Sequence, residues 1–417
     1  MPILLPEDMN IKLPKMLKVK QNFPGDHIED VAARISEIVS EDKISALIHP
    51  GQKVAVAVGS RMINNIYVII KRLIDELKAR GAEPFIVPAM GSHGGGTPEG
   101  CIGVLEDFGI TEESVGVPIR AEMDVVKLGT IISEADGKEI DVYTAKASYE
   151  ADMTVLVNRI KPHTEFTGRY ESGICKMATI GLGKHVGCTS LHAGNTLNFD
   201  KIIPQAAKMV YDKSNIGFAI GIIENAYDQT KMIEGMTRDE ILDKEPGLLE
   251  IAKASMPSIG IPEIDVLVVE EIGKDISGFG MDTNIVGLIG PKKEEPQIPK
   301  IGKVIVVRLS EKGQGNACGI GLADLTTKEL YDNINFENTY ANSFACGGSF
   351  GYWTEFIPLV MTDEKEAVVG AIKMLGIKET EKTRIVKIKN TLRLGEIQVS
   401  ESLREYVESK PERFTIE

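Results

Sequence analysis

Four side chains of this sequence suit acid–base, nucleophilic or metal chemistry: His93, His163, Lys176 and His192. Histidine changes its charge near neutral pH, and its ring nitrogens also bind metals. The chain has only six histidines, and the three named here stand in glycine-rich or loop-like segments. These four residues are therefore the first candidates for an active centre.

Two glycine loops add possible ligands for an anion. His93 lies in the first, residues 91–96, directly before a helix start, and its neighbours Gly94 and Gly95 allow close backbone approach. Free N–H groups and the helix dipole favour an anion there. The second loop carries Ser60 and Arg61 after an apolar run. A loop histidine that bonds only its own backbone is the alternative for His93.

The densest polar segment, residues 158–195, contains the other three candidates. Pro162 fixes the backbone next to His163 and would aim its ring reproducibly. Lys176 lies among small and apolar residues, where desolvation would leave a more nucleophilic amine. A lysine that extends from a helix to solvent is the alternative. His192 is either a metal ligand or a loop histidine that caps the next segment.

Predicted strands and helices alternate regularly around these loops. Apolar runs at residues 53–58 and 84–88 predict buried strands, and helical periodicity from 65 to 80 ends at Gly81. Thr97 and Pro98 are a typical N-cap and first helical residue. This order predicts a parallel, doubly wound sheet, in which functional loops follow the carboxyl ends of the strands.

The rest of the chain indicates two domains, because 417 residues exceed the usual size of one. Further strands are expected at residues 154–157, 264–269 and 303–307, and helices at 28–48 and 364–375. We place the boundary near residue 262. The predicted domains are residues 1–262 and 263–417.

Composition excludes some classes of function. The chain has 61 acidic and 47 basic residues and a net charge of −14, which argues against a nucleic-acid surface. No segment has the ~20 apolar residues that span a bilayer, and the start lacks the features of a signal peptide. Five cysteines without a CxxC pair fit a reducing cytoplasm, without a disulfide framework or a structural zinc site. We therefore expect a soluble, cytoplasmic enzyme, with neither nucleic acid nor a membrane as partner.

Taken in order, the motifs resemble those of the nickel-pincer-nucleotide lactate racemases and their homologues. The chain contains Gly59-Ser60-Arg61, then the loop from Gly91 to Glu99, then Pro162-His163. Gly173 to Lys176 follows, and His192 comes sixteen residues after that lysine. Farther on, residues 273–276 (Gly-Lys-Asp-Ile) resemble a turn of the family's second domain. The similarity is best between residues 50 and 200.

This resemblance implies a role for each candidate. Lys176 would form the thioamide that tethers a pyridinium-derived nucleotide carrying nickel, and His192 would be the protein ligand of that nickel. His93 and His163 would be the acid–base pair at the substrate hydroxyl. The phosphate contacts would come from Ser60, Arg61, Gly94 and Gly95.

The implied enzyme is an isomerase that racemises or epimerises a 2-hydroxy acid by hydride transfer to the cofactor, through a keto acid. The resemblance further implies an N-terminal Rossmann-like parallel sheet, a second α/β domain and an active site in the cleft between them. Cofactor-synthesis enzymes would be partners, so a host that lacks them should yield protein without the cofactor. The sequence leaves the oligomeric state open, a homo-oligomer included.

Two departures from the family pattern concern recognition of phosphate and substrate. The family's Asp-x-Thr-Arg is replaced by Val58-Gly59-Ser60-Arg61, and residues 279–283 (Phe-Gly-Met-Asp-Thr) replace a Tyr-Gln pair and a lysine linked to substrate binding. The sequence therefore predicts a substrate other than lactate.

Two alternatives remain at this point. In the first, His93, His163 and His192 bind a divalent metal for hydrolase or lyase chemistry, although no HExxH-type spacing is present. In the second, the lysine and the glycine loops hold a nucleotide without catalysis.

Overall fold

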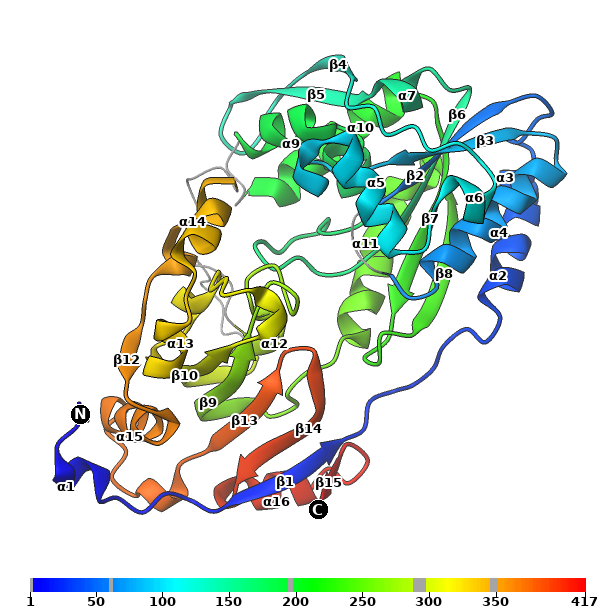
Figure 1. Ribbon diagram of the computed structural model, residues 1–417. Helices are drawn as coiled ribbons and strands as arrows, with labels where there is room; N and C mark the ends of the chain where they lie inside the picture. Colours follow the sequence, from blue (N-terminus) through cyan, green and yellow to red (C-terminus); the bar gives the residue numbers. More distant parts are fainter. Residues whose placement is uncertain (1–2, 60–62, 194–197, 288–297, 346–351) are drawn as a thin grey trace. The chain divides into compact units, whose positions relative to one another are not determined.

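The computed structural model describes residues 3–59, 63–193, 198–287, 298–345 and 352–417 (Figure 1). The chain forms two compact units. One is continuous, Pro24–Met256, and is called the 24–256 unit. The other joins Met1–Phe23 to Pro257–Glu417 and is called the 257–417 unit. Within the described ranges, no helix is long and apolar enough to cross a membrane.

The 24–256 unit is built on a five-stranded sheet in the order β3-β2-β6-β7-β8. All neighbours are parallel except β7 and β8. The strands are β2 (Lys53–Val58), β3 (Glu83–Pro88), β6 (Met153–Arg159), β7 (Ile216–Glu224) and β8 (Thr230–Thr237). A separate antiparallel ribbon consists of β4 (Val125–Ile132) and β5 (Glu139–Ala145).

Both faces of this sheet are buried, as a parallel sheet requires. Alternate residues of β2 enter two different apolar clusters: Ala55 and Ala57 face one, Val54 and Val56 the other. The helices on the Val54 side are α2 (Val31–Ser40), α3 (Asp42–Ser45), α4 (Ile66–Ala79), α5 (Pro98–Asp107) and α6 (Glu112–Val115).

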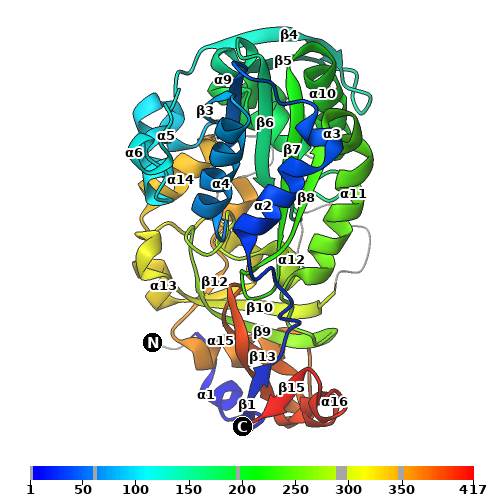
Figure 2. The same ribbon diagram turned by 90° about the vertical axis from the view of Figure 1, so that its right-hand side faces the viewer.

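The Ala55 side carries the helices that matter for the candidate site. They are α7 (Lys146–Tyr149), α8 (Ile174–Lys176), the π-helical turn η2 (Met177–Gly181), α9 (Lys184–His192), α10 (Phe199–Lys213) and α11 (Arg238–Ser255). The β4–β5 ribbon lies beside α9 and α10, as Figure 2 shows.

The 257–417 unit contains an eight-stranded sheet in the order β12-β11-β10-β9-β13-β14-β1-β15. The first five strands are parallel and the last three antiparallel. They are β12 (Leu359–Met361), β11 (Leu325–Thr327), β10 (Lys300–Leu309), β9 (Glu263–Ile272), β13 (Ile385–Asn390), β14 (Arg393–Ser400), β1 (Met16–Gln21) and β15 (Phe414–Ile416). The helices are α1 (Pro6–Met9), α12 (Thr283–Val286), α13 (Lys328–Asp332), α14 (Phe336–Ala345), α15 (Glu364–Met374) and α16 (Arg404–Glu408).

The predicted parallel sheet is confirmed, and so are the expected strands and the Thr97 cap, whose side chain accepts the N–H of Gly100 at 3.1 Å. The helix expected over residues 28–48 is wrong in detail. Glu41, with ψ 132°, is extended, so α2 stops at Ser40 and α3 begins at Asp42.

The observed division of the chain differs from residues 1–262 and 263–417. The chain passes from one unit to the other between residues 23 and 24 and again between residues 256 and 257, so the first 23 residues belong to the 257–417 unit. The physical reason is strand pairing, because β1 bonds to β14 on one side and to β15 on the other.

Candidate active site

One interrupted helical run carries both Lys176 and His192. It consists of α8, η2 and α9, and in η2 the N–H of Leu182 donates to the carbonyl oxygen of Met177, five residues back, at 2.8 Å. A straight α-helix would set residues sixteen apart at roughly 160° from each other around the axis. The π-helical turn, and the left-handed backbone of Lys184 (φ 54°), break that geometry. Such turns often occur at functional sites.

Lys176 and His163 are in close polar contact. Their side-chain nitrogens, Nζ and Nε2, lie 2.5 Å apart. The other ring nitrogen of His163, Nδ1, accepts the backbone N–H of Glu165 at 3.1 Å. Both Lys176 and His163 are half-buried.

Two phenylalanines connect this pair to His192. Phe166 stacks on the His163 ring at 4.4 Å between centroids, and Lys176 Nζ lies 5.8 Å from the Phe166 centroid. Phe199 meets Phe166 edge-on at 5.6 Å and His192 at 4.9 Å. The structure therefore gathers His163, Lys176 and His192 around one apolar aromatic wall.

The orientation of His192 is set by its own helix. Its Nδ1 lies 2.7 Å from the carbonyl oxygen of Cys188, one turn earlier, and 3.5 Å from the Cys188 sulfur. A carbonyl can only accept, so Nδ1 carries the proton and Nε2 can present a lone pair. This is how metal-binding histidines are usually oriented. Burial alone would lower the pKa of His192 and raise that of Cys188. The hydrogen bonds and the charge interaction between these two residues, with hydrogen bonds from Ser92 to Cys188, together outweigh burial, so the pKa of His192 is raised and that of Cys188 is lowered.

A buried carboxylate, Glu171, fixes the loop of His163. It accepts the backbone N–H of His163 at 2.7 Å and that of Gly168 at 3.1 Å. Its charge is balanced by Lys253 of α11, at 3.0 Å. Glu171 therefore determines the path of the backbone on which His163 stands.

A second buried carboxyl, Glu245 of α11, lies at the start of α8. It accepts the N–H of Cys175 at 2.8 Å, and a Cβ on Gly173 would meet its Oε1 at 2.2 Å, so only glycine fits there. Burial raises the pKa of Glu245 to about 7, although hydrogen bonds from Cys175 and Ile174 oppose the shift. Glu245 thus fixes the turn that carries Lys176 through the backbone of the residue before it.

The His93 loop packs against the same helical run. A Cβ on Gly91 would lie 3.6 Å from that of Cys188, and the Cys188 thiol donates to Ser92 Oγ at 3.6 Å. His93 itself is exposed, and its Nδ1 lies 2.8 Å from the carbonyl oxygen of Met90. The loop that carries His93 therefore packs against α9. The hydrogen bond of the His93 ring to Met90 joins it to the residue just before its own loop, and His93 takes part in a further interaction as well.

The anion loops are described in part. Ser60 and Arg61 lie outside the described residues. Gly94 and Gly95 form a single 3-10 turn, η1 (Gly94–Gly96), with φ 64° and 66°. A Cβ on Gly94 would be 2.6 Å from the carbonyl carbon of Gly100, whereas one on Gly95 would meet no described atom within 4 Å. The backbone at Gly95 is accessible, as an anion site needs.

Some residues of the site gave no signal in the sequence. They are Glu171, Glu245, Phe166, Phe199 and Cys188. A buried carboxylate is recognisable only from its partners, and those lie as far as 82 positions along the chain, as with Glu171 and Lys253. Among the described residues, no three His, Cys, Asp or Glu side chains are grouped as a metal site.

The fold and the site define an α/β protein. Its chemistry-bearing loops follow the carboxyl ends of β3 and β6, which flank β2 in the sheet. Residues 2–201 match the family described as lactate racemase N-terminal domain. A comparison with curated protein sequences finds no match.

Two solved structures share the fold. The lactate racemase apoprotein from Thermoanaerobacterium thermosaccharolyticum aligns with a TM-score of 0.56 and 11% identity, over 91% of this chain and 99% of that one. A protein from Thermotoga maritima aligns with a TM-score of 0.52 and 17% identity, over 89% and 99%. At these identities the likeness concerns the fold alone.

Proposed function

We propose that the protein is a nickel-pincer-nucleotide-dependent isomerase that racemises or epimerises a small 2-hydroxy acid. The observation that carries the proposal is the grouping of Lys176, His163 and His192 around Phe166 and Phe199. It is supported by the match of residues 2–201 to the lactate racemase N-terminal domain.

The residues present fit such a cofactor in two respects. Lys176 offers an amine for the covalent tether, and His192 offers one ring nitrogen to nickel while its other nitrogen is held by Cys188. The chemistry that the group supplies when bound is reversible hydride acceptance. The exposed backbone at Gly95, with Gly94, Ser60 and Arg61, is assigned to the nucleotide phosphate.

The protein's own part in the reaction is proton transfer and orientation. As the substrate carbon becomes planar, one histidine takes the proton of the hydroxyl oxygen, and on return a histidine gives it back. We assign these steps to His93 and His163, because two bases allow either enantiomer to enter. The aromatic wall covers one side of the site. Glu171 and Glu245 hold the backbone on which His163 and Lys176 stand in a fixed position.

Replacement of residues 279–283 in the substrate-binding turn leads us to propose a substrate other than lactate. Met281, Asp282 and Thr283 are buried, so these side chains are not available to a carboxylate. We also propose a cytoplasmic protein, because Cys101, Cys175, Cys188 and Cys318 are free thiols.

The test is co-expression with the cofactor-synthesis enzymes, followed by peptide mass mapping and nickel analysis. We expect an added nucleotide mass on Lys176 together with nickel, and no such mass in Lys176→Met. An unmodified Lys176 under saturating cofactor supply would contradict the proposal.

Activity should then be sought by screening single enantiomers of 2-hydroxy acids and sugar acids for loss of optical rotation. Hydride transfer predicts that a substrate deuterated at the reacting carbon keeps its label through racemisation. Exchange of that label with solvent would instead indicate simple proton removal. His93→Asn should lose turnover but keep the adduct on Lys176.

A further inference from the structure

A pocket of about 540 Å³ opens in the 257–417 unit, at the carboxyl ends of three neighbouring parallel strands. Glu271 of β9, Arg308 of β10 and Asn390 of β13 line it, each at the last or next-to-last position of its strand. The turns that follow these strands supply the other walls. Small-molecule sites have volumes of roughly 300 to 1,000 Å³, so the pocket has the size of a ligand site.

The order of the strands puts this pocket where the chain reverses its direction along the sheet. From β9 the chain adds β10, β11 and β12 one after another on one side, and β13 then pairs with β9 on the other (Figure 1). The connections that leave β9 and β13 therefore run to opposite sides. Open α/β sheets bind their ligands in the crevice that such a reversal leaves at the carboxyl ends of the strands. Topology and cavity thus point to the same place.

Asn390 fixes one wall of the pocket. It is 5% exposed, donates to Glu271 at 2.9 Å, and accepts the N–H groups of Leu392 and Arg393, both at 3.0 Å. The second carboxylate oxygen of Glu271 pairs with Lys389 at 3.1 Å. Asn390 therefore sets the turn that carries Arg393, and Glu271 is already bonded at both oxygens.

Ser310 fixes the opposite wall. Its hydroxyl donates to Asp275 at 2.5 Å and accepts the N–H of Gly313 at 3.2 Å. A Cβ on Gly273 would lie 2.0 Å from the Ser310 oxygen, so the turn after β9 and the turn after β10 are in close contact. The backbone around the pocket is thus held in place by the protein itself.

The lining is rich in cations, although the chain as a whole is acidic. Four lining side chains are cations and three are carboxylates, whereas the whole chain has a net charge of −14. The cations are Arg308, Lys312, Lys389 and Arg393, and the carboxylates are Glu271, Asp275 and Glu311. Lys312 and Arg393 are exposed, so their charges are open to an anion from solution.

We propose that this pocket binds a small polyhydroxylated anion, a sugar phosphate or a sugar acid, whose charge is held by Arg308, Lys312 and Arg393. A guanidinium group can bond two oxygens of one phosphate or carboxylate, and two arginines line the pocket. Ionised carboxylates only accept hydrogen bonds. Asp275 and Glu311 therefore favour a ligand that also carries hydroxyl donors.

This binding site does not depend on the proposed function. Every residue that lines the pocket belongs to the 257–417 unit. The residues assigned to the cofactor tether, to nickel and to proton transfer all belong to the 24–256 unit. Either assignment can therefore fail while the other stands.

The test is isothermal titration calorimetry of the full-length protein with three probes that share a hydroxylated carbon chain: glucose 6-phosphate, gluconate and glucose. We expect saturable binding of at least one anion and no binding of neutral glucose. Binding should weaken as salt is added, because salt screens exposed charges. The anion that binds more tightly identifies whether the pocket selects phosphate or carboxylate.

Hydrogen exchange followed by mass spectrometry locates the bound anion. We expect protection in residues 305–313 and 386–395, which include the ends of β10 and β13 and the turns after them. Protection confined to residues 91–97 would instead place the anion at the glycine loop of His93, and would overturn the inference.

Variants with matched controls separate the pocket from general surface charge. Arg393→Ala and Lys312→Ala should each weaken binding by about tenfold or more, since each removes a charged contact. Arg393→Ala keeps the backbone N–H that Asn390 accepts, so the turn should persist. Arg404→Ala and Lys328→Ala remove an exposed arginine and an exposed lysine of the same unit that do not line the pocket, and should leave binding unchanged.

Three further results would overturn the inference. The first is the lack of saturable binding by either anion at millimolar concentrations. The second is equally tight binding of glucose. The third is unchanged binding in a protein that carries both Arg393→Ala and Lys312→Ala.

Discussion

The effect of the buried Lys184 amine on the free energy of unfolding can be measured. It is 1% exposed, and its Nζ donates one hydrogen bond, 2.8 Å long, to the carbonyl oxygen of Pro88. Burial lowers the pKa of Lys184 from 10.5 to about 8, although the nearby Cys101 and Glu122 oppose the shift. The charged form is therefore disfavoured in the folded state.

The sign of the resulting pH dependence follows directly. Between pH 8 and 10.5 the unfolded chain binds more protons than the native one, so the free energy of unfolding rises with pH. Lys184→Met should remove about 3 kcal/mol of that rise. Urea unfolding at several pH values measures it, with the exposed Lys208→Met as control. An unchanged pH dependence in Lys184→Met would contradict the assignment.

Glu245 predicts the opposite trend at lower pH. Burial raises its pKa from 4.5 to about 7, so between these values the native state binds more protons and stability falls as pH rises. Glu245→Gln keeps the hydrogen-bond acceptor and should abolish a fall of about 3 kcal/mol. Unfolding by urea at pH 4.5, 5.5 and 7 checks this.

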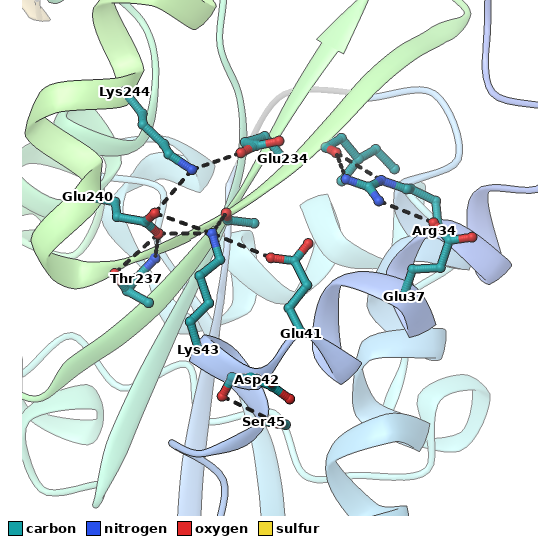
Figure 3. Close-up of polar contacts among 12 residues, drawn as sticks. Arg34, Glu37, Glu41, Asp42, Lys43, Ser45, Glu234, Thr237, Glu240 and Lys244 are labelled. Atoms are coloured by element: carbon teal, nitrogen blue, oxygen red, sulfur yellow. Dashed lines mark hydrogen bonds and ion pairs between the residues drawn. The ribbon is translucent and has the colours of Figure 1, made fainter.

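The matched control lies on the same helix. Hydrogen bonds from the Thr237 backbone and from Lys43 and Lys244 lower the pKa of Glu240 to about 2, although burial opposes them. Figure 3 shows this cluster. Its effect is confined to pH values below 4.5, so Glu240→Gln should leave the Glu245 window unchanged. If Glu240→Gln also abolished the fall in unfolding free energy, that fall could not be assigned to Glu245.

At the scale of elements, α11 is the support of the site. Tyr170 donates to the carbonyl oxygen of Leu242 at 2.6 Å, Lys253 pairs with Glu171, and Glu245 holds the start of α8. Three contacts from one helix thus fix the loop that runs from His163 to Lys176. These supporting side chains are separate from the reactive groups. Within the described ranges, none of the contacts named here reaches the Lys176 amine or the His163 ring.

Breaking the middle contact tests this support. Lys253→Met leaves the fully buried Glu171 carboxylate without its ion pair, and removing one partner of a buried pair costs about 3 kcal/mol or more. We expect faster hydrogen exchange in residues 161–176. Lys244→Met breaks a more exposed pair in the cluster of Figure 3 and should cost about 1 kcal/mol or less. Equal effects in the two variants would argue against a special role for Lys253.

At the scale of the molecule, the N-terminal strand belongs to the 257–417 unit. Val19 of β1 is 1% exposed and lies opposite Ile397 of β14 and Ile416 of β15. Val19→Asp would bury an unpaired charge between two strands. We expect exchange protection to fall in residues 385–400 and to stay unchanged in β2 and β6.

The control for that prediction is the adjacent residue. Lys18 is exposed on the same strand, so Lys18→Asp should leave both units protected. Hydrogen exchange followed by mass spectrometry reads each unit separately. Loss of protection in β2 and β6 of Val19→Asp would show that the 24–256 unit depends on this strand.

Several elements were predictable because their signals are local. The apolar run of β2, the Thr97 cap and the end of α4 near Gly81 depend on neighbouring residues only. Helix α2 was predicted too long, because the extended Glu41 interrupts a pattern that is otherwise helical. The roles of His93, His163, Lys176 and His192 stay predictions until the cofactor and substrate experiments are done.

The sequence by itself determined which groups are available and on which loops they stand, because strand patterns, caps and glycine turns are written within a few residues. Only the tertiary structure decided how these groups meet. Nothing local could show that the Lys176 amine lies beside Nε2 of His163, that Glu171 and Glu245 bond the backbone of His163 and Cys175, or that β1 pairs with β14. These contacts join residues 8 to 384 positions apart, and their formation depends on the packing of the whole chain.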